Sequence, residues 1–386
     1  MEITFVADRF SAEGGGCERY LVELATAAAR TGWVVRVLCR QAGEGATLPG
    51  VARVRVFAGP AWRAEPRLRQ AVAEERGRHP ERAVLAVRPV PGATHYQLHT
   101  GLYRQAFAAE RDSTNGLRRL LYWPALRLNP RRTILLGAER EVLRRSASTR
   151  LMVFSEALAR ELVANRRVPA GHVRVSRPGV DLARFHPRRE TSNPPRTAAA
   201  PELACLFVGH DFALKGLDQA ITALAELNRG GVRARLRVAG AGPGATFARA
   251  AARAGLAKLV SFLGGIHPAA LAEEYRGADV LVHPTFYDPF SRVVVEALAS
   301  GCPVVTTRTC GAAELIEQGR EGLLIDHPRD LGGLTGALAS LADAGRRAAM
   351  GRAAAALGQT MDFTRHAAEV LDWLSEPILC PDDSPP

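Results

Sequence analysis

Lysine is nearly missing from this chain, and its cysteines form no recognisable pattern. Only Lys215 and Lys258 are lysine among 51 basic residues, so the other 49 are arginine. The six cysteines contain no CxxC pair and lie in no His-rich segment, which argues against a zinc site or a disulfide framework. We therefore expect a reducing, cytoplasmic location and no zinc site.

Long apolar runs are missing as well. Arg, Gly, Pro or acidic residues interrupt every apolar segment before it reaches the roughly 20 residues that cross a bilayer. The first residues, 1–7, lack the basic start and the cleavage site of a signal peptide and are typical of a β-strand instead. We expect neither secretion nor a membrane span.

Positive charge is concentrated in one segment. The chain carries a formal net charge of +12, and residues 102–150 contain 11 Arg against four acidic residues. Such a segment attracts an anionic membrane surface or a phosphorylated glycolipid, although a biased nucleotide composition explains the arginines equally well. Nucleic acid is not an expected partner, because no nucleic-acid module is present and few aromatic residues are interleaved with the arginines. Peripheral attachment to the inner face of the cytoplasmic membrane fits this pattern.

Short β-rich runs alternate with helical stretches along the whole chain, which predicts an α/β fold of parallel sheets covered by helices. Residues 187–201 hold four prolines and no hydrophobic period, the composition of an exposed linker. We predict an N-terminal Rossmann-like domain (1–187, joined by a C-terminal helix at about 362–378), a second such domain (188–361) and a disordered tail (379–386). The predicted strands are 3–7, 34–39, 51–57, 83–87, 95–98, 151–154, 173–176, 204–208, 236–239, 260–263, 280–283, 303–307 and 322–325.

A glycine-rich turn, Gly14–Gly16, follows the first predicted strand and precedes a helix at 18–30. Glycine lets the backbone pass close to a ligand, and a helix N-terminus offers N–H groups to an anion. The pattern does not satisfy GxGxxG, so a dinucleotide site and a purely structural turn remain alternatives.

A second turn places one of the two lysines at the start of a helix. The strand that ends at Val208 runs into Gly209-His210, and Lys215-Gly216 precedes a helix at 217–227. There the Lys215 ammonium can neutralise phosphate oxygens that the helix end also attracts. A solvated surface lysine is the alternative.

The third constellation contains two carboxylates. Asp288 lies in a loop after a strand, and Glu296 lies in an otherwise almost wholly apolar helix that starts near Ser291. A buried carboxylate needs donors, and a ribose diol supplies two. Asp288-Pro289 is also what a helix N-cap followed by a first-turn proline looks like.

The motif from Asp288 to Glu296, followed by Ala-Leu-Ala-Ser-Gly-Cys-Pro-Val-Val, resembles the pattern of the family-4 retaining glycosyltransferases of GT-B fold, in which two Rossmann-like domains face each other across a cleft. Residues 176–187, 236–243 and 311–316 resemble further segments of that family. Within it, residues 209–216, 144–154 and 281–307 are most similar to the lipopolysaccharide core glucosyltransferase I group.

The resemblance implies roles for individual residues. Glu296 would hold the ribose hydroxyls, Lys215 the diphosphate, and Asp288 the hydroxyls of the donor sugar. His99 would contact the donor or acceptor sugar, with a core histidine as the alternative, so the implied catalytic residues are Asp288, Lys215 and His99. The implied donor-binding residues are Gly15, Gly16, Gly209, His210, Lys215, Gly240, Asp288, Phe290, Ser291 and Glu296.

Two of these positions depart from the family pattern. Asp288 stands where the family usually has Glu, which leaves the choice of donor sugar open, and His210 stands where many relatives have a phosphate-binding Arg. Lys215 is then the main cation, and we expect Lys215→Ala to lose most turnover while folding normally.

The implied reaction is transfer of a hexose, glucose from UDP-glucose as the inherited expectation, to a glycolipid or lipopolysaccharide-core acceptor. It proceeds with retention and needs neither metal nor cofactor, since the nucleotide-sugar is a substrate. Three alternatives stay open: a nucleotide-sugar epimerase of the same architecture, a nicotinamide-dependent oxidoreductase, and a non-catalytic basic membrane-surface protein.

Overall fold

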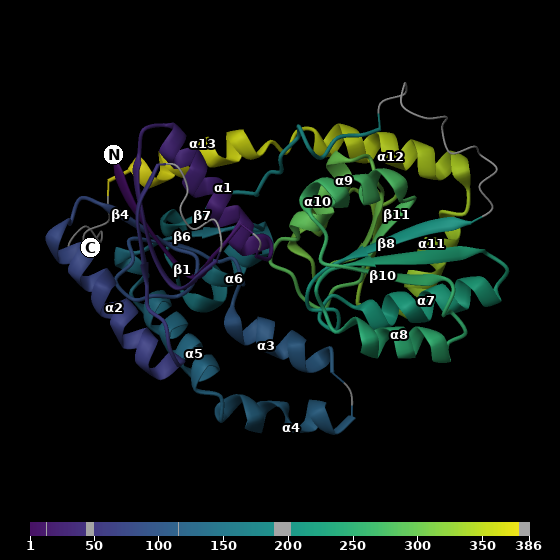
Figure 1. Cartoon of the computed structure of the whole chain (residues 1–386), viewed down its shortest axis with the longest axis horizontal. Coiled ribbons are helices and arrows are strands. Elements are labelled where there is room, and N and C mark those ends of the chain that lie inside the picture. Colours follow the sequence, from purple (N-terminus) through teal and green to yellow (C-terminus); the bar gives the residue numbers. More distant parts are fainter. Residues whose placement is uncertain (13, 44–49, 115, 189–201, 378–386) are drawn as a thin grey trace. The chain divides into compact units, whose positions relative to one another are not determined.

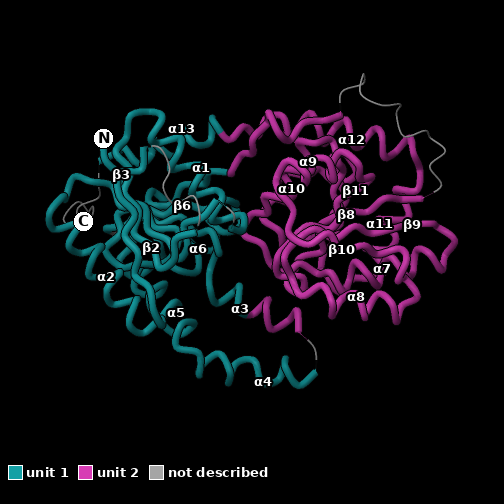
Figure 2. The backbone as a smooth tube through the Cα atoms, in the orientation of Figure 1, with its two compact units in different colours: residues 1–107, 116–177, 364–386 teal, residues 108–115, 178–363 magenta. Residues whose placement is uncertain are grey.

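The chain forms two compact units, shown in Figure 2. The structure is a computed structural model that describes residues 1–12, 14–43, 50–114, 116–188 and 202–377. Unit 1 comprises residues 1–107, 116–177 and 364–386, and unit 2 comprises residues 108–115 and 178–363. The chain thus changes units at Arg177/Pro178, ahead of the predicted boundary at 187/188. Most of the predicted linker, and the predicted disordered tail, lie outside the described residues.

Unit 1 is built on a seven-stranded sheet in the order β3-β2-β1-β4-β5-β6-β7, with all neighbours parallel. The central strand β4 is buried along its whole length, as expected of a strand covered by helices on both faces. The strands are β1 (Glu2–Phe10), β2 (Val34–Ala42), β3 (Val51–Val56), β4 (Ala83–Ala86), β5 (His95–Gln97), β6 (Arg150–Val153) and β7 (Val173–Val175).

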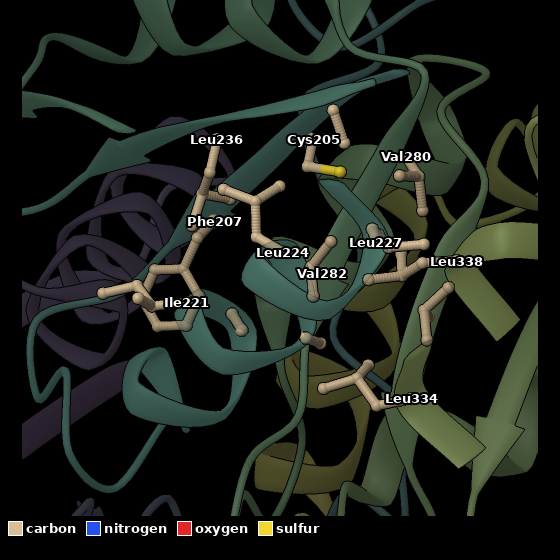
Figure 3. Close-up of a cluster of buried hydrophobic side chains, with 14 of the residues drawn as sticks. Cys205, Phe207, Ile221, Leu224, Leu227, Leu236, Val280, Val282, Leu334 and Leu338 are labelled. Atoms are coloured by element: carbon tan, nitrogen blue, oxygen red, sulfur yellow. The ribbon is translucent and has the colours of Figure 1, made fainter. Parts of the chain in front are cut away.

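Unit 2 has a six-stranded parallel sheet in the order β10-β9-β8-β11-β12-β13. Its core, part of which is drawn in Figure 3, packs Phe207 and Leu236 of the sheet against Leu224 of α7 (Leu217–Arg229). The strands are β8 (Leu203–Val208), β9 (Ala234–Ala239), β10 (Val260–Gly264), β11 (Val280–His283), β12 (Val304–Thr307) and β13 (Gly322–Ile325). Each of the strands predicted from the sequence occurs, within about two residues at most ends; β1 and β2 run three residues further.

Helices cover the two sheets, as Figure 1 shows. In unit 1, His366 on α13 hydrogen-bonds to Tyr20 on α1, so the last helix of the chain belongs to the first sheet. No helix in the described part of the chain is both long and apolar enough to cross a membrane. The helices are α1 (Gly16–Arg30), α2 (Ala61–Arg78), α3 (Tyr103–Asp112), α4 (Gly116–Arg127), α5 (Pro130–Arg144), α6 (Glu156–Arg166), α7 (Leu217–Arg229), α8 (Gly244–Arg253), α9 (Pro268–Gly277), α10 (Arg292–Ala299), α11 (Leu331–Ser340), α12 (Ala344–Gly358) and α13 (Phe363–Ser375), with short 3₁₀ turns η1 (Ser146–Ser148), η2 (Ala170–His172) and η3 (Gly311–Leu315).

The order of the second sheet reverses between β8 and β11. The chain leaves β8 towards β9 and β10 on one side, then returns to place β11 on the other side. In open parallel sheets, ligands bind beyond the carboxyl ends of the strands at such a switch point. The loops that follow β8 and β11 carry Lys215 and Asp288, so the fold brings these two residues to the expected place.

Candidate functional site

The turn between β8 and α7 holds Lys215 in a fixed backbone geometry. The Lys215 N–H donates to the carbonyl of Asp211 at 2.9 Å, and the Leu214 N–H donates to the Asp211 carboxylate at 3.1 Å. Gly216 then starts α7 with a φ of +80°, and a Cβ there would lie 2.1 Å from the carbonyl oxygen of Pro284. Only glycine fits this position, which brings the turn directly against the loop after β11.

Gly209 and Gly240 meet where the loops after β8 and β9 approach each other. Gly240 has a φ of +142°, and a Cβ on it would lie 1.6 Å from the Gly209 carbonyl oxygen. A Cβ on Gly209 would lie 3.1 Å from Cγ of Lys215. Both predicted donor-binding glycines therefore have a packing role in this turn.

Backbone and threonine hydrogen bonds hold the loop after β11. The Phe286 N–H donates to the Leu214 carbonyl at 2.9 Å and ties this loop to the Lys215 turn. The hydroxyls of Thr307 and Thr309 donate to the Thr285 carbonyl at 2.6 and 2.7 Å. On the far side of the loop, the Gly311 N–H donates to the Asp288 carbonyl at 2.7 Å. Hydrogen bonds within the protein thus fix the position of this loop.

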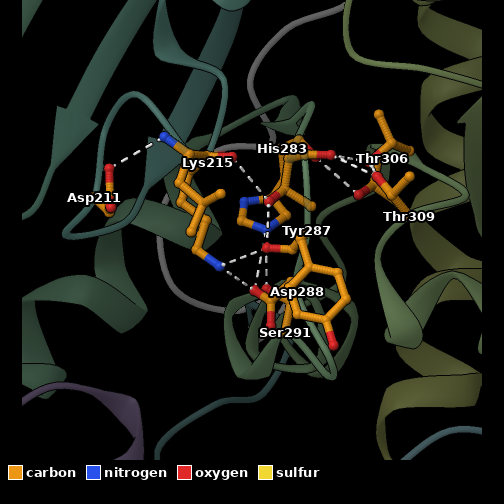
Figure 4. Close-up of polar contacts among 11 residues, drawn as sticks. Asp211, Lys215, His283, Tyr287, Asp288, Ser291, Thr306 and Thr309 are labelled. Carbon is orange, nitrogen blue, oxygen red and sulfur yellow. Dashed lines mark hydrogen bonds and ion pairs between the residues drawn. The ribbon is translucent and has the colours of Figure 1, made fainter. Parts of the chain in front are cut away.

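Lys215 and Asp288 form an ion pair, drawn in Figure 4. Lys215 Nζ lies 2.7 Å from Asp288 Oδ2 and 3.5 Å from the Tyr287 carbonyl oxygen. The two side chains are 19% and 13% exposed. Burial acts to raise the pKa of Asp288, but the adjacent Lys215 ammonium and the His283 ring together outweigh it and hold that pKa well below its usual range. The carboxylate is therefore ionised, and it neutralises the lysine that we expect to meet the diphosphate.

His283, at the end of β11, is a site residue that sequence reasoning did not find. Its Nε2 lies 3.1 Å from the Ser291 hydroxyl and 3.6 Å from Asp288 Oδ2. Burial and the neighbouring Lys215 ammonium lower the pKa of His283, so the ring is neutral at pH 7. In the sequence, the only sign of its role was that a histidine ends the strand eight residues before Ser291. Through its contact with the Ser291 hydroxyl, the buried ring holds the N-terminal end of α10 in place.

The helix α10 begins at this site and carries Glu296. Ser291 is its N-cap residue but directs its hydroxyl to His283 rather than to the first-turn N–H groups, and Phe290 is buried just before it. Glu296 is 1% exposed, and its Oε2 accepts a hydrogen bond from the Tyr275 hydroxyl at 3.0 Å. The predicted need of this carboxylate for donors is thus met in part within the protein, by a tyrosine on α9 that the sequence analysis missed.

The structure therefore brings Lys215, Asp288 and Ser291 together, with Glu296 further along the same helix. The side chain of His210 is exposed at the start of the Lys215 turn. Among the residues that the structure describes, no three His, Cys, Asp or Glu side chains are grouped so that they could hold a metal ion.

The remaining predicted residues belong to unit 1. Gly15 is the N-cap residue of α1, and Gly16 is the first residue of that helix. His99 follows β5 and is half-buried, with its ring 4.7 Å from that of Tyr20 and 4.8 Å from that of Phe154. Its Nε2 lies 2.9 Å from Gln97 Oε1.

Family models and curated relatives of known function match this chain. A family model described as Glycosyltransferase Family 4 matches residues 14–184, and one described as Glycosyl transferases group 1 matches residues 189–356. The D-inositol 3-phosphate glycosyltransferase of Pseudarthrobacter chlorophenolicus is 30% identical over 391 residues, which cover 94% of this chain and 90% of that protein. D-inositol 3-phosphate glycosyltransferase 2 of Catenulispora acidiphila is 35% identical over 236 residues, which cover 58% of this chain and 55% of that protein.

Solved structures share the fold. WaaG, described as a glycosyltransferase involved in lipopolysaccharide biosynthesis, aligns with a TM-score of 0.79 at 22% identity and covers 97% of this chain and 100% of its own. HepE of Anabaena in complex with UDP-glucose aligns with a TM-score of 0.70 at 20% identity and covers 97% and 99%. With two parallel-sheet α/β units and both family models matched, the chain belongs to the group 1 glycosyltransferases of GT-B type.

Proposed function

We propose that the protein is a retaining, metal-independent hexosyltransferase that uses a nucleotide-sugar donor, with UDP-glucose as the first candidate. The observation that carries this proposal is the Lys215–Asp288 ion pair at the switch point of unit 2, beside the N-terminal ends of α7 and α10. A cation and two helix N-termini suit a diphosphate. The solved HepE complexes contain UDP, and UDP-glucose in one of them, within the same fold.

In the proposed reaction, the bond between the anomeric carbon and the diphosphate oxygen breaks, and the acceptor oxygen bonds to the same face of the sugar. The departing phosphate takes the proton of the acceptor hydroxyl, so the protein supplies no nucleophile. Lys215 stabilises the negative charge that develops on the leaving diphosphate, while Asp288 accepts hydrogen bonds from the sugar hydroxyls. Glu296 holds the ribose from within α10.

The donor can be identified without knowing the acceptor. A thermal-shift screen of nucleotide-sugars should raise the melting temperature with the true donor, because a ligand that binds only the folded state stabilises it. Incubation of that donor alone should leave the sugar unchanged, whereas an epimerase would convert it. Proton NMR of the isolated product should then show the anomeric configuration of the donor, and inversion would refute the retaining mechanism.

Two acceptor classes are candidates, one suggested by the relatives and one by the basic helices of unit 1. Those named D-inositol 3-phosphate glycosyltransferases favour a phosphorylated polyol, whereas the basic helices α4 and α5 suit a glycolipid or lipopolysaccharide-core acceptor at a membrane surface. An acceptor panel that contains both classes, read by nucleotide release, decides between them. If nucleotide is released with inositol phosphate and with no lipid acceptor, the acceptor is a phosphorylated polyol.

The helix α4 adds an apolar feature to that basic surface. Its residues Leu117, Leu120 and Leu121 are 68%, 75% and 50% exposed, and Leu128 just beyond its end is 84% exposed. Their spacing places them on one side of the helix, opposite the buried Leu126. By the same spacing Arg118 and Arg127 flank this stripe on its two sides, and Arg131 and Arg132 follow at the start of α5.

We propose that this apolar and cationic face of α4 rests on an anionic lipid surface. The protein should co-sediment with vesicles of phosphatidylglycerol and phosphatidylcholine, and not with phosphatidylcholine alone. Leu120→Ser/Leu121→Ser should lose this binding, while the control Val163→Ser, at a 38% exposed site on α6, should keep it. If the double variant binds the vesicles as well as the parent does, α4 does not contact the lipid surface.

A further inference from the structure

A chain of buried polar side chains crosses the interior of unit 1 and ends at His99. His99 Nε2 lies 2.9 Å from Gln97 Oε1, and Gln97 Nε2 lies 2.7 Å from the Tyr20 hydroxyl. The same hydroxyl lies 2.9 Å from His366 Nε2. On the other side of that ring, His366 Nδ1 lies 3.1 Å from the Ser176 hydroxyl. Five residues from α1, β5, α13 and the segments after β5 and β7 thus form one continuous path.

This path is polar where a core would ordinarily be apolar. Gln97 and Tyr20 are 0% exposed, and His366 is 2% exposed. Burial of such groups costs free energy unless each one is hydrogen-bonded, and here every link has a partner at hydrogen-bond distance. A network of this kind fixes one arrangement of its members.

The Gln97 amide sets the direction of the two hydrogen bonds that it makes in the path. Its Nε2 is a donor only, and it faces the Tyr20 oxygen and the sulfur of Met152 at 3.2 Å. If the Tyr20 hydroxyl then donates to His366 Nε2, His366 carries its proton on Nδ1, towards Ser176. At the other end, Gln97 Oε1 can only accept, so His99 donates from Nε2.

We propose that Gln97, Tyr20 and His366 are positioning residues that hold the His99 ring in one orientation and as its Nε2–H tautomer, the form in which it meets the sugar. This inference rests on the proposed function and on the contact of His99 with the donor or acceptor sugar that the family resemblance implies. It assigns to α13, the last helix of the chain, a part in the sugar site of unit 1. His99 itself is held on two sides by the rings of Tyr20 and Phe154.

The tautomer can be measured without any activity. Long-range ¹H–¹⁵N correlation spectra of histidine-labelled protein, with His99 assigned by its absence from the His99→Ala spectrum, should show the proton on Nε2. Tyr20→Phe removes the hydroxyl that Gln97 and His366 share, and it should broaden the His99 signals or shift them towards a mixture of tautomers. A proton on Nδ1 in the parent protein would overturn the assignment.

Kinetics tests the consequence for transfer. We expect Tyr20→Phe and His366→Leu to lower kcat by about 10- to 100-fold, the effect of a misplaced contact group, with little change in the KM for the donor. His366→Gln keeps an acceptor and a donor in one side chain and should recover much of the loss. The matched control is Trp373→Phe, on the same helix, whose ring contacts His95 at 4.5 Å rather than the path; its kcat should stay within about twofold of the parent.

A double-mutant cycle separates positioning from general damage. If Tyr20 acts through His99, then Tyr20→Phe should have no further effect on kcat in the His99→Ala background. The same fold-loss in that background, or an equal loss in Trp373→Phe, would overturn the inference. If His99→Ala turns over like the parent, the inference fails while the proposed function stands. If the parent releases nucleotide from no activated sugar, the proposed function fails, and the kinetic part of the inference fails with it.

Discussion

Replacement of Lys215 by methionine removes the ammonium that we assign to the leaving diphosphate and keeps most of the side-chain volume. The ammonium lies 2.7 Å from Asp288 Oδ2, so the change also leaves a carboxylate that is only 13% exposed without its cation. Breaking a fully buried pair in this way costs about 3–5 kcal/mol of stability, which is an upper limit for this partly buried one. The sequence alone predicts normal folding for a variant without this charge; the structure adds this cost.

The effect on turnover is separate from the effect on stability. Loss of one preorganised group that stabilises developing charge lowers kcat by about 10²- to 10³-fold. Lys215→Met/Asp288→Asn removes both charges and should regain most of the stability without regaining turnover. Comparison of the single and double variants therefore separates the charge needed for folding from the charge needed for transfer.

The assay is nucleotide release at saturating donor, with urea unfolding of the same samples. Lys258→Met is the matched control, because Lys258 is the other lysine and is exposed; it should match the parent in both measurements. If Lys215→Met releases nucleotide within about threefold of the parent, a loss far below that of a leaving-group contact, the assigned role is wrong. A double variant as unstable as the single one would show that the ion pair does not set the cost.

Three further changes test other parts of the structure. Burial raises the pKa of Glu139 to about 7 from 4.5, so the folded state holds this proton more tightly than the unfolded state. The free energy of unfolding therefore falls as the pH rises from 4.5 to about 7. In urea unfolding, Glu139→Gln should be about 3 kcal/mol more stable than the parent at pH 8 and equally stable below pH 4. Glu296→Gln removes the charge proposed to hold the ribose and should weaken UDP binding about tenfold by calorimetry, with unchanged affinity refuting the contact. Gly240→Ala should prevent stable folding, because its Cβ would lie 1.6 Å from a backbone oxygen, whereas Gly255→Ala, with φ +78° and open space, should cost only about 1–2 kcal/mol.

The sequence predicts the elements of this fold well because local patterns determine them. Short apolar runs ended by glycine, proline or polar turns are sufficient to locate strands such as β8 and β11. The parallel alternation then places the residues after their carboxyl ends on one edge of a sheet. Lys215 and Asp288 were found in this way, although they are 73 residues apart in the chain.

The partners of these residues were not predictable, because nothing local marks them. Tyr275 reaches Glu296 from the preceding helix, and only the packed sheet brings the two together. The contact between Tyr20 and His366 joins residues 346 positions apart. Hydrophobic period shows that a helix has an apolar side, but it does not show whether protein covers that side, so the exposed leucines of α4 also required the structure.

The place of α13 in unit 1 has a consequence for biosynthesis. Unit 2 is one continuous segment, residues 178–363, apart from the short piece 108–115. Unit 1 instead combines the first part of the chain with the segment from residue 364 onward. Val370 and Trp373 of that segment are 0% and 3% exposed. A growing polypeptide therefore cannot close the interior of its first sheet until α13 has left the ribosome, so unit 1, which is started first, is completed after unit 2.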